Sequence, residues 1–436
     1  MATDTGHRAG RAARFLSVPE AVAGARALAR RHPQRCRLRV VGRSRGGRPL
    51  VLLSICGDGP SVLVVGGPHP NEPVGWTSTL YLARHLLSQR GERHPADPAW
   101  HFLLCLDPDG AALTDGWPAG PPSMARHFEH FHRPAFDDQP EWLSARGDEG
   151  RPLPETLALT RLIDETRPAL QCSLHGVDLG GAFLELTRAV PGLSDRFARS
   201  ARQARMPLDV GTYDAYGWVS PSPGTYLMPA AGEPGSFAAL PDSPGDSTWA
   251  YAGRHGGVTA VVEAPMWAAD AVADGRPHPQ AAAALRAAGQ DLIAGAGELD
   301  DLLAQARPQL MEERPGQLLA SAEFNLKVAT GLADGWVAVP GMTVSQVVNL
   351  EIASERIPLR IAALLRRLLA GAAGGHRAEP LRARLEHEVT ERRERFAERF
   401  GARWIPVEDQ VSHQVRTVLA AADCVTGCDL PEPRSA

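Results

Sequence analysis

The chain has 436 residues, of which 44% are hydrophobic and 22% are charged, so its length and composition allow one large globular domain or two. Its 46 Lys and Arg residues are outnumbered by 50 Asp and Glu residues, and the formal net charge of -4 argues against nucleic acid as a partner. The basic start, residues 1–22, lacks the apolar core of a signal peptide, and no run of about 18 apolar residues could span a membrane, so we expect a cytoplasmic protein.

Helices and strands are predicted to alternate through the first part of the chain. Apolar residues at helical spacing predict helices, which cover 19–31, 72–87 and 154–167. Short apolar runs bounded by turn residues predict strands, which lie on both sides of a turn at 43–47 and at 62–65, 101–106, 169–174 and 258–262. This alternation predicts an α/β fold with a mixed, mostly parallel sheet and helices on both faces.

The character of the sequence changes near residues 270–277. Beyond this point the chain reads as mainly helical, although 315–340 is mixed and is expected to contain strands. We therefore predict a catalytic domain over 1–275 and a mainly helical C-terminal extension over 276–436. The helices of the extension could equally cover the sheet, and they are a candidate surface for oligomerisation.

Polar side chains with metal-binding chemistry follow the predicted strand ends. His69 and Glu72 come just after the strand at 62–65, and His175 and Glu263 each follow an apolar strand of their own. Imidazole and carboxylate are ligands of Zn²⁺, and a catalytic zinc typically has three protein ligands and one water. The set His69, Glu72 and His175 therefore predicts a zinc site, with Glu263 as a candidate base for the water. Taken alone, the His69 and Glu72 pair also fits a helix that starts with an acidic residue.

The motifs that carry these residues resemble those of the zinc metallocarboxypeptidase family. They are His69-Pro70-Asn71-Glu72, Asp-Pro-Asp-Gly at 107–110, Ser173-Leu174-His175-Gly176, and Ser247-Thr248-Trp249-Ala250-Tyr251 ahead of Val261-Val262-Glu263. They occur in the order found in that family, so the resemblance covers roughly residues 35–267. It implies the family's α/β fold and one Zn²⁺ per chain bound by His69, Glu72 and His175, with Glu263 as general base and then proton shuttle.

The resemblance also implies arginines that act on the substrate. Arg126 is our candidate for the arginine that opposes the oxyanion. The family's carboxylate-binding segment aligns with His130-Phe131-His132-Arg133-Pro134, where Arg133 is retained and the acid and both asparagines are not. The alternative for both arginines is a structural ion pair with Glu129 or Asp137.

Other residues of the matching segments are assigned to substrate binding. We place His132, Tyr251 and Asp246 there, and a carboxylate at Asp246 would favour a basic side chain on the substrate. The histidines at 127, 130 and 132 permit a second metal, but altered substrate recognition explains them better.

The expected activity is a zinc-dependent amide hydrolase, acting as a carboxypeptidase on an intracellular peptide or amino-acid conjugate. One alternative is an N-acyl amino-acid deacylase that uses the same site. Another is a relative that binds peptides without cleaving them, although such a binder has no need of Glu263 as a base.

Overall fold

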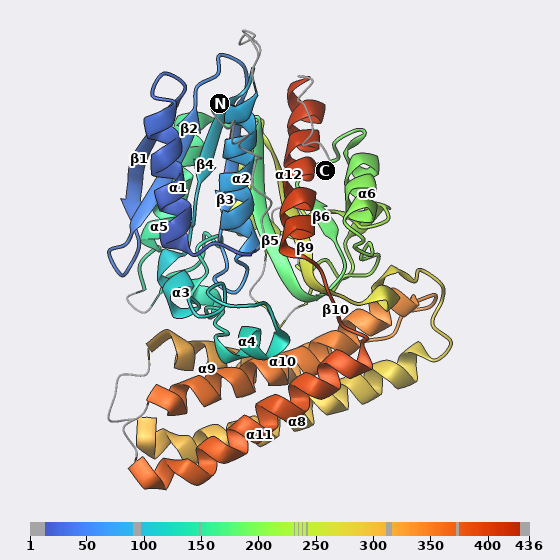
Figure 1. Cartoon of the computed structure of the whole chain (residues 1–436). Coiled ribbons are helices and arrows are strands. Elements are labelled where there is room, and N and C mark those ends of the chain that lie inside the picture. The colour runs from blue at the N-terminus through green and yellow to red at the C-terminus, as the bar shows by residue number, and fades with distance from the viewer. Residues whose placement is uncertain are drawn as a thin grey trace, which may run out of the picture.

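The computed structural model describes residues 14–89, 97–147, 150–230, 232–233, 235–237, 239–240, 243–310, 316–371 and 375–427. These residues form a large sheet with helices on both faces and a further layer of long helices across one end (Figure 1). In the described part of the chain, no helix is both long enough and apolar enough to cross a bilayer.

Within the described residues, the sheet contains ten strands in the spatial order β1-β2-β4-β3-β5-β9-β6-β8-β7, with β10 paired to β9. Their bounds are β1 Cys36–Arg43, β2 Pro49–Ile55, β3 Ser61–Gly66, β4 Ala99–Leu103, β5 Leu170–Gly180, β6 Phe183–Leu186, β7 Val219–Ser222, β8 Thr225–Leu227, β9 Val258–Ala268 and β10 Arg403–Trp404. The central strands β4, β3, β5 and β9 run parallel, whereas β1 and β2 form an antiparallel hairpin and β6 is antiparallel to β9. This arrangement confirms the predicted mixed sheet.

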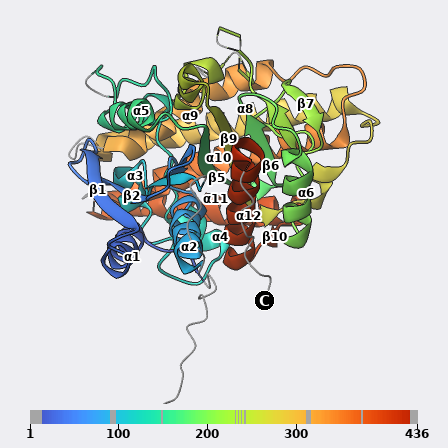
Figure 2. The ribbon, with the colours of Figure 1, turned by 90° about the horizontal axis from the view of Figure 1, so that it is seen from above.

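The helices have the following bounds: α1 Val18–Arg31, α2 Val74–Ser88, α3 Pro108–Leu113, α4 Met124–Glu129, α5 Pro154–Thr166, α6 Leu193–Gln203, α7 Thr248–Tyr251, α8 Ala281–Leu310, α9 Gly316–Asp334, α10 Val344–Gly371, α11 Gly375–Arg399 and α12 Val407–Thr426. Helices α1, α2 and α12 pack on one face of the sheet, and α5 and α7 pack on the other. In both views α12 lies between α2 and α6 (Figures 1 and 2).

Strand β3 shows why the central strands read as continuous apolar runs. Side chains alternate along a strand, so Val62 and Val64 enter the core beneath α2, while Leu63 and Val65 enter the core beneath α5. Because helices cover both faces, every side chain from Val62 to Val65 is fully buried. The apolar run therefore marks a strand in the middle of the sheet.

The C-terminal helices do not stay apart from the sheet. Helices α8 to α11 form the layer across its end, with α10 in contact with β5 and α4. The chain then returns through β10, which pairs with β9, and ends in α12 on the sheet face. The division into 1–275 and 276–436 stays a prediction. The prediction of strands within 315–340 is wrong for the described residues. Helix α9 occupies Gly316–Asp334 and packs against α8 and α10.

Candidate metal centre and substrate pocket

A tight glycine turn after β3 presents the first two candidate ligands. Gly67 has a φ of +57°, and a Cβ at this position would lie 2.7 Å from the Trp76 ring, so only glycine fits. Helix α2 begins at Val74, two residues later than predicted, which leaves Glu72 in the turn before it. The side chains of His69 and Glu72 therefore both lie beside the end of β3, at 5% and 2% exposure.

The third ligand candidate and the candidate base are partners across neighbouring strands. His175 on β5 is in register with Glu263 on β9, so both side chains leave the sheet on the same face. Both strands continue past these residues, which therefore lie within the strands and not at their ends. Strand β3 ends level with Leu174, so the turn that carries His69 lies next to His175.

His69, Glu72 and His175 have the spacing of a tetrahedral metal site. Nδ1 of His69 lies 3.3 Å from Oε2 of Glu72. Nδ1 of His175 lies 3.1 Å from Nδ1 of His69 and 3.4 Å from Oε2 of Glu72. Zinc bonds of about 2.0–2.1 Å in a tetrahedron place neighbouring ligand atoms roughly 3.3 Å apart. The three donors thus fit Zn²⁺. Among the described residues, these three are the His, Cys, Asp and Glu side chains found close enough together to hold a metal ion.

The charges around the donors also suit a cation. Burial alone would lower the pKa of His175, but Glu141, Glu72 and Glu263 outweigh it and raise that pKa well above its usual range. Surroundings that stabilise a proton on a buried ring would equally stabilise a metal ion beside it. Burial lowers the pKa of His69, which favours the neutral imidazole that metal binding requires.

Glu141 holds the far side of the His175 ring. Its Oε2 lies 3.0 Å from Nε2 of His175, while its Oε1 accepts hydrogen bonds from Ser173 Oγ at 2.6 Å and Trp249 Nε1 at 2.7 Å. A carboxylate on one imidazole nitrogen directs the other nitrogen toward a metal. Sequence reasoning missed Glu141, because it lies in a loop with no strand end or ligand spacing to mark it.

Glu263 lies beside the donors with one oxygen uncommitted. Its Oε1 is 3.7 Å from Nδ1 of His175, and its buried Oε2 has no hydrogen-bond partner in the described part of the chain. Burial raises the pKa of Glu263 well above its usual range, and Glu72, Asp214 and Glu185 act in the same direction. A buried carboxyl oxygen without a partner fits a group that meets a water or a substrate.

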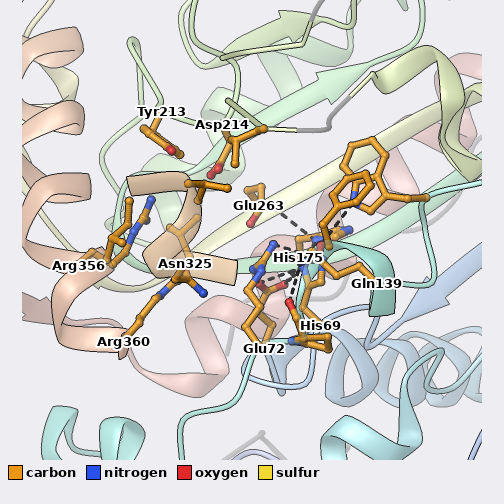
Figure 3. Close-up of a pocket in the computed structure, with 18 of the residues that line it drawn as sticks. His69, Glu72, Gln139, His175, Tyr213, Asp214, Glu263, Asn325, Arg356 and Arg360 are labelled. Atoms are coloured by element: carbon orange, nitrogen blue, oxygen red, sulfur yellow. Dashed lines mark hydrogen bonds and ion pairs between the residues drawn. The ribbon is translucent and has the colours of Figure 1, made fainter. Parts of the chain in front are cut away.

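The donors form one wall of a pocket of about 200 Å³ that the C-terminal helices complete. Figure 3 shows the ligand candidates and Glu263 on the side of the sheet, Tyr213 and Asp214 on a loop, and Arg356 and Arg360 on α10. The wall formed by α9 and α10 consists of Phe324, Asn325, Val328, Leu332, Arg356, Ile357 and Arg360.

The two arginines predicted for catalysis and binding have different positions. Arg133 lines the pocket and points at the ligand candidates, with Nη1 donating to Oε1 of Glu72 at 2.7 Å and Nη2 3.2 Å from Nε2 of His69. Arg126 is not part of the lining, because it lies on α4 with its guanidinium packed against Gly120. The arginine next to the metal-ligand candidates is therefore Arg133, whereas the sequence had suggested Arg126 as the arginine that opposes the oxyanion.

Three further residues predicted to bind substrate are also absent from the pocket lining. His132 is fully buried, because neighbouring side chains of an extended segment point to opposite sides and Arg133 takes the pocket side. Tyr251 lies on α7, two residues after the pocket residue Trp249, so its side chain points away from the pocket. Its hydroxyl group donates a hydrogen bond to Oδ2 of Asp164 at 2.9 Å. Asp246 is exposed.

The histidine group at 127–132 does not assemble a second metal site. His127 packs among aromatic rings, with Nε2 3.7 Å from Asp178 Oδ1, and both nitrogens of His132 are buried without a hydrogen-bond partner among the described residues. These two rings therefore fill separate parts of the core.

Comparison with known proteins agrees with this geometry. Residues 22–190 match the family model described as zinc carboxypeptidase, which confirms the resemblance indicated by the motifs. The matched segment contains His69, Glu72 and His175 and ends before Glu263. No curated protein matches the sequence. The family match and the three donors together support a metallopeptidase.

Several solved structures show partial similarity. A metallocarboxypeptidase from Burkholderia cenocepacia has 17% identity and a TM-score of 0.37, over 56% of this chain and 58% of that one. A putative metallopeptidase from Shewanella denitrificans has 17% identity and a TM-score of 0.38, over 57% of this chain and 81% of that one. Carboxypeptidase A from Helicoverpa armigera has 17% identity and a TM-score of 0.36, over 58% and 65%.

Proposed function

We propose that the protein is a zinc-dependent hydrolase that cleaves an amide bond, removing the C-terminal residue of a peptide or splitting an amino-acid conjugate. The observation that carries this proposal is the set of donor atoms on His69, Glu72 and His175, which lie 3.1 to 3.4 Å apart. Glu263 lies directly opposite His175 on the neighbouring strand β9. A site that only bound a ligand would have no need of a buried carboxylate with a free oxygen at this point.

Zinc held by His69, Glu72 and His175 would polarise the substrate carbonyl and lower the pKa of a water in the open position. Glu263 accepts the proton of the attacking water at a carboxylate oxygen and donates it to the leaving nitrogen. Arg133, the guanidinium nearest the donors, faces negative charge that develops on the carbonyl oxygen. The small pocket favours a short substrate or the end of a longer one.

Elemental analysis of purified protein tests the metal site first. We expect about one zinc per chain in the wild type and little in His175→Ala, since three ligands are needed to hold a catalytic zinc. A folded wild type that takes up no zinc when it is supplied would overturn the ligand assignment.

A panel of dipeptides and N-acyl amino acids then tests the reaction. We expect Glu263→Gln to retain zinc but to lose about 10²- to 10⁴-fold in kcat, the usual contribution of a general base. Cleavage of acyl groups alone would identify a deacylase in place of a carboxypeptidase. Equal inactivity of wild type and Glu263→Gln on every amide, with zinc bound in both, would indicate a binding protein.

A further inference from the structure

The two histidines among the candidate ligands differ in what faces their second ring nitrogen. Nε2 of His175 lies 3.0 Å from a carboxylate oxygen of Glu141. Nε2 of His69 lies 3.2 Å from Nη2 of Arg133. A histidine that binds a metal through one nitrogen usually donates the N–H of the other to an acceptor such as a carboxylate. His175 fits this pattern and His69 does not, because a guanidinium has no acceptor atom.

The contact with Arg133 determines which tautomer of His69 is compatible with the structure. Since Arg133 can only donate, Nε2 of a neutral His69 ring accepts the hydrogen bond, and the single ring N–H is then on Nδ1. Oε2 of Glu72 lies 3.3 Å from this Nδ1 and can accept that N–H. Nη1 of Arg133 donates to the other oxygen of Glu72 at 2.7 Å. Arg133 therefore holds two of the three candidate ligands at once.

Binding of a metal by His69 requires the opposite tautomer. Nδ1 of His69 faces the other donors, 3.1 Å from Nδ1 of His175, so it is the nitrogen that would bind the metal. It can do so only through its lone pair, and the ring N–H is then on Nε2. An N–H of Arg133 would oppose that N–H, and the positive charges of guanidinium and metal would also repel each other. A metal on Nδ1 and a guanidinium on Nε2 of His69 therefore exclude one another.

Arg133 has room to leave His69. Its side chain is 29% exposed, compared with 2% for Glu72, and it lines the pocket, so the guanidinium can turn to that side. Within the described residues, the guanidinium hydrogen bonds go to Glu72 and His69. The backbone is held separately, because Ser321 donates to the backbone oxygen of Arg133. The side chain can therefore turn while the segment stays in place.

We propose that Arg133 is a positioning residue that opposes metal binding at His69 and turns away from it when the metal is bound. The inference rests on the zinc site of the proposed function and adds a coupling between that site and this arginine. In one arrangement Arg133 stabilises the Nδ1–H tautomer of His69. In the other, Nδ1 binds the metal and the guanidinium is released toward the pocket, where the proposed reaction uses it to face the carbonyl oxygen.

Zinc affinity, measured by competition with a chelator, tests this opposition. We expect Arg133→Gln to bind zinc about 10- to 100-fold more tightly than wild type, the range for a contact with a charged group. Glutamine removes the charge, and its amide oxygen can accept the N–H of Nε2. Arg133→Lys keeps a positive charge and only donor groups, so it should bind zinc less tightly than Arg133→Gln. Replacing a residue with a purely structural role would not raise zinc affinity.

Arg126→Gln is the matched control. Arg126 lies seven residues before Arg133 and outside the pocket lining, with its guanidinium against Gly120. The same substitution there removes the same charge at a distance from the candidate ligands, so zinc affinity should equal that of wild type. An equal gain in both variants would show that net charge sets the affinity, and it would overturn the inference.

The tautomer of His69 is measured by long-range proton–nitrogen correlation spectra of protein with isotope-labelled histidine. At about pH 8 an ordinary imidazole is neutral, and we expect the N–H on Nδ1 in chelator-treated wild type and on Nε2 in zinc-loaded wild type. The signals of His69 are assigned by their loss in His69→Asn. Chelator-treated Arg133→Gln should show no preference for Nδ1. An N–H on Nε2 in chelator-treated wild type would overturn the inference, whatever the variants do.

The outcomes separate this inference from the proposed function. Equal or weaker zinc binding by Arg133→Gln, with an unchanged melting temperature, would overturn the coupling and leave the hydrolase in place. Tighter zinc binding by Arg133→Gln with the expected tautomers, but no hydrolysis of any amide by wild type, would support the coupling and refute the hydrolase. If Arg133→Gln has a lower melting temperature and binds zinc more weakly, the spectra of wild type decide.

Discussion

His175 is the side chain on which the candidate metal site depends, because its two nitrogens face different partners. Nδ1 lies among the other donors, while Nε2 lies 3.0 Å from Glu141 and also 3.0 Å from Ser173 Oγ. We predict that Glu141→Gln weakens zinc binding by about 10- to 100-fold, because an amide fixes the ring less firmly than a carboxylate does. Zinc titration against a competing chelator measures the effect.

Glu155→Gln is the matched control for Glu141→Gln. Glu155 is also fully buried and accepts a hydrogen bond from the backbone N–H of Arg45 at 2.9 Å, but it lies outside the pocket lining. Its substitution should cost stability and leave zinc affinity unchanged. A similar loss of zinc affinity in both variants would show that Glu141 acts only through stability.

His413 makes stability depend on pH. Burial, with Arg416 adding to it, lowers the pKa of His413 to about 3, while the unfolded chain has its ordinary pKa near 6.5. A depressed pKa means that the unfolded state binds more protons, so the contribution is present above about pH 6.5 and is lost as pH falls toward 3. We predict that this residue accounts for about 2 kcal/mol of the loss in unfolding free energy between pH 7 and pH 5.

His413→Asn tests this, because asparagine can keep the hydrogen bond between Nδ1 and Ser200 but cannot take up a proton. Urea unfolding of the metal-free protein at both pH values should show a pH dependence about 2 kcal/mol smaller than in the wild type. Phe197→Leu, which alters the ring packed on His413, should lower stability equally at both pH values. An unchanged pH dependence in His413→Asn would contradict the assignment.

Sequence could locate the donors but not every residue around them. His69, Glu72, His175 and Glu263 come together because backbone register places them, and apolar strands are visible in a single sequence. The prediction that Arg126 opposes the oxyanion failed, because a long side chain seven residues before Arg133 can point toward the pocket or away from it. Packing decides between these directions, and packing is not visible in the sequence. Arg356 approaches from a helix far along the chain, and its only signal is a charged residue within an apolar helix face.

Helix α12 joins the two strands that carry the site. Nε2 of Gln414 donates to the backbone oxygen of His175 at 2.6 Å and to that of Val262 at 3.3 Å, thereby bridging β5 and β9. We predict that Gln414→Leu lowers the unfolding free energy by about 1–3 kcal/mol, because buried carbonyl groups lose a donor. Zinc affinity should fall as well, because the position of His175 is then less well fixed.

Gln410→Leu controls for the change of side chain. Gln410 lies one turn earlier on α12, is equally buried, and donates to the Ile405 oxygen at 2.7 Å, away from the pocket. Its substitution should reduce stability by a similar amount and leave zinc affinity as it is. Equal zinc affinity in Gln414→Leu and wild type, measured by chelator competition, would refute a role for α12 at the site.

The helix at 316–334 shows where local pattern fails. Its sequence mixes Val, Thr and Phe with Leu and Ala and includes Gly331, so helix and strand preferences nearly balance. Packing against α8 and α10 then decides in favour of a helix. The strands at 62–65 and 258–262 were easier to predict, because burial on both faces produces an unbroken apolar run.

The pocket depends on contacts between the sheet and the C-terminal helices. Asp178 on β5 and Arg360 on α10 form a buried ion pair, Ser321 on α9 donates to the Arg133 backbone oxygen, and Arg367 on α10 donates to that of Phe131. These contacts connect the two regions, 1–275 and 276–436, that the sequence analysis predicted as separate domains. Such an interface favours one cooperative unit over two independent domains.

Asp178→Asn therefore tests whether the molecule unfolds as one body. It leaves the Arg360 charge buried without its partner, so we predict a loss of about 3–5 kcal/mol. The loss should appear to the same extent in far-ultraviolet circular dichroism, dominated by helices, and in tryptophan fluorescence, to which Trp142 and Trp249 in the pocket contribute. If the circular dichroism transition alone shifts and the fluorescence transition stays in place, the helices unfold separately and the division at 275 is a true domain boundary. Coincident shifts would mean that the pocket exists only while both parts are folded, because coincidence of different probes is the mark of cooperative unfolding.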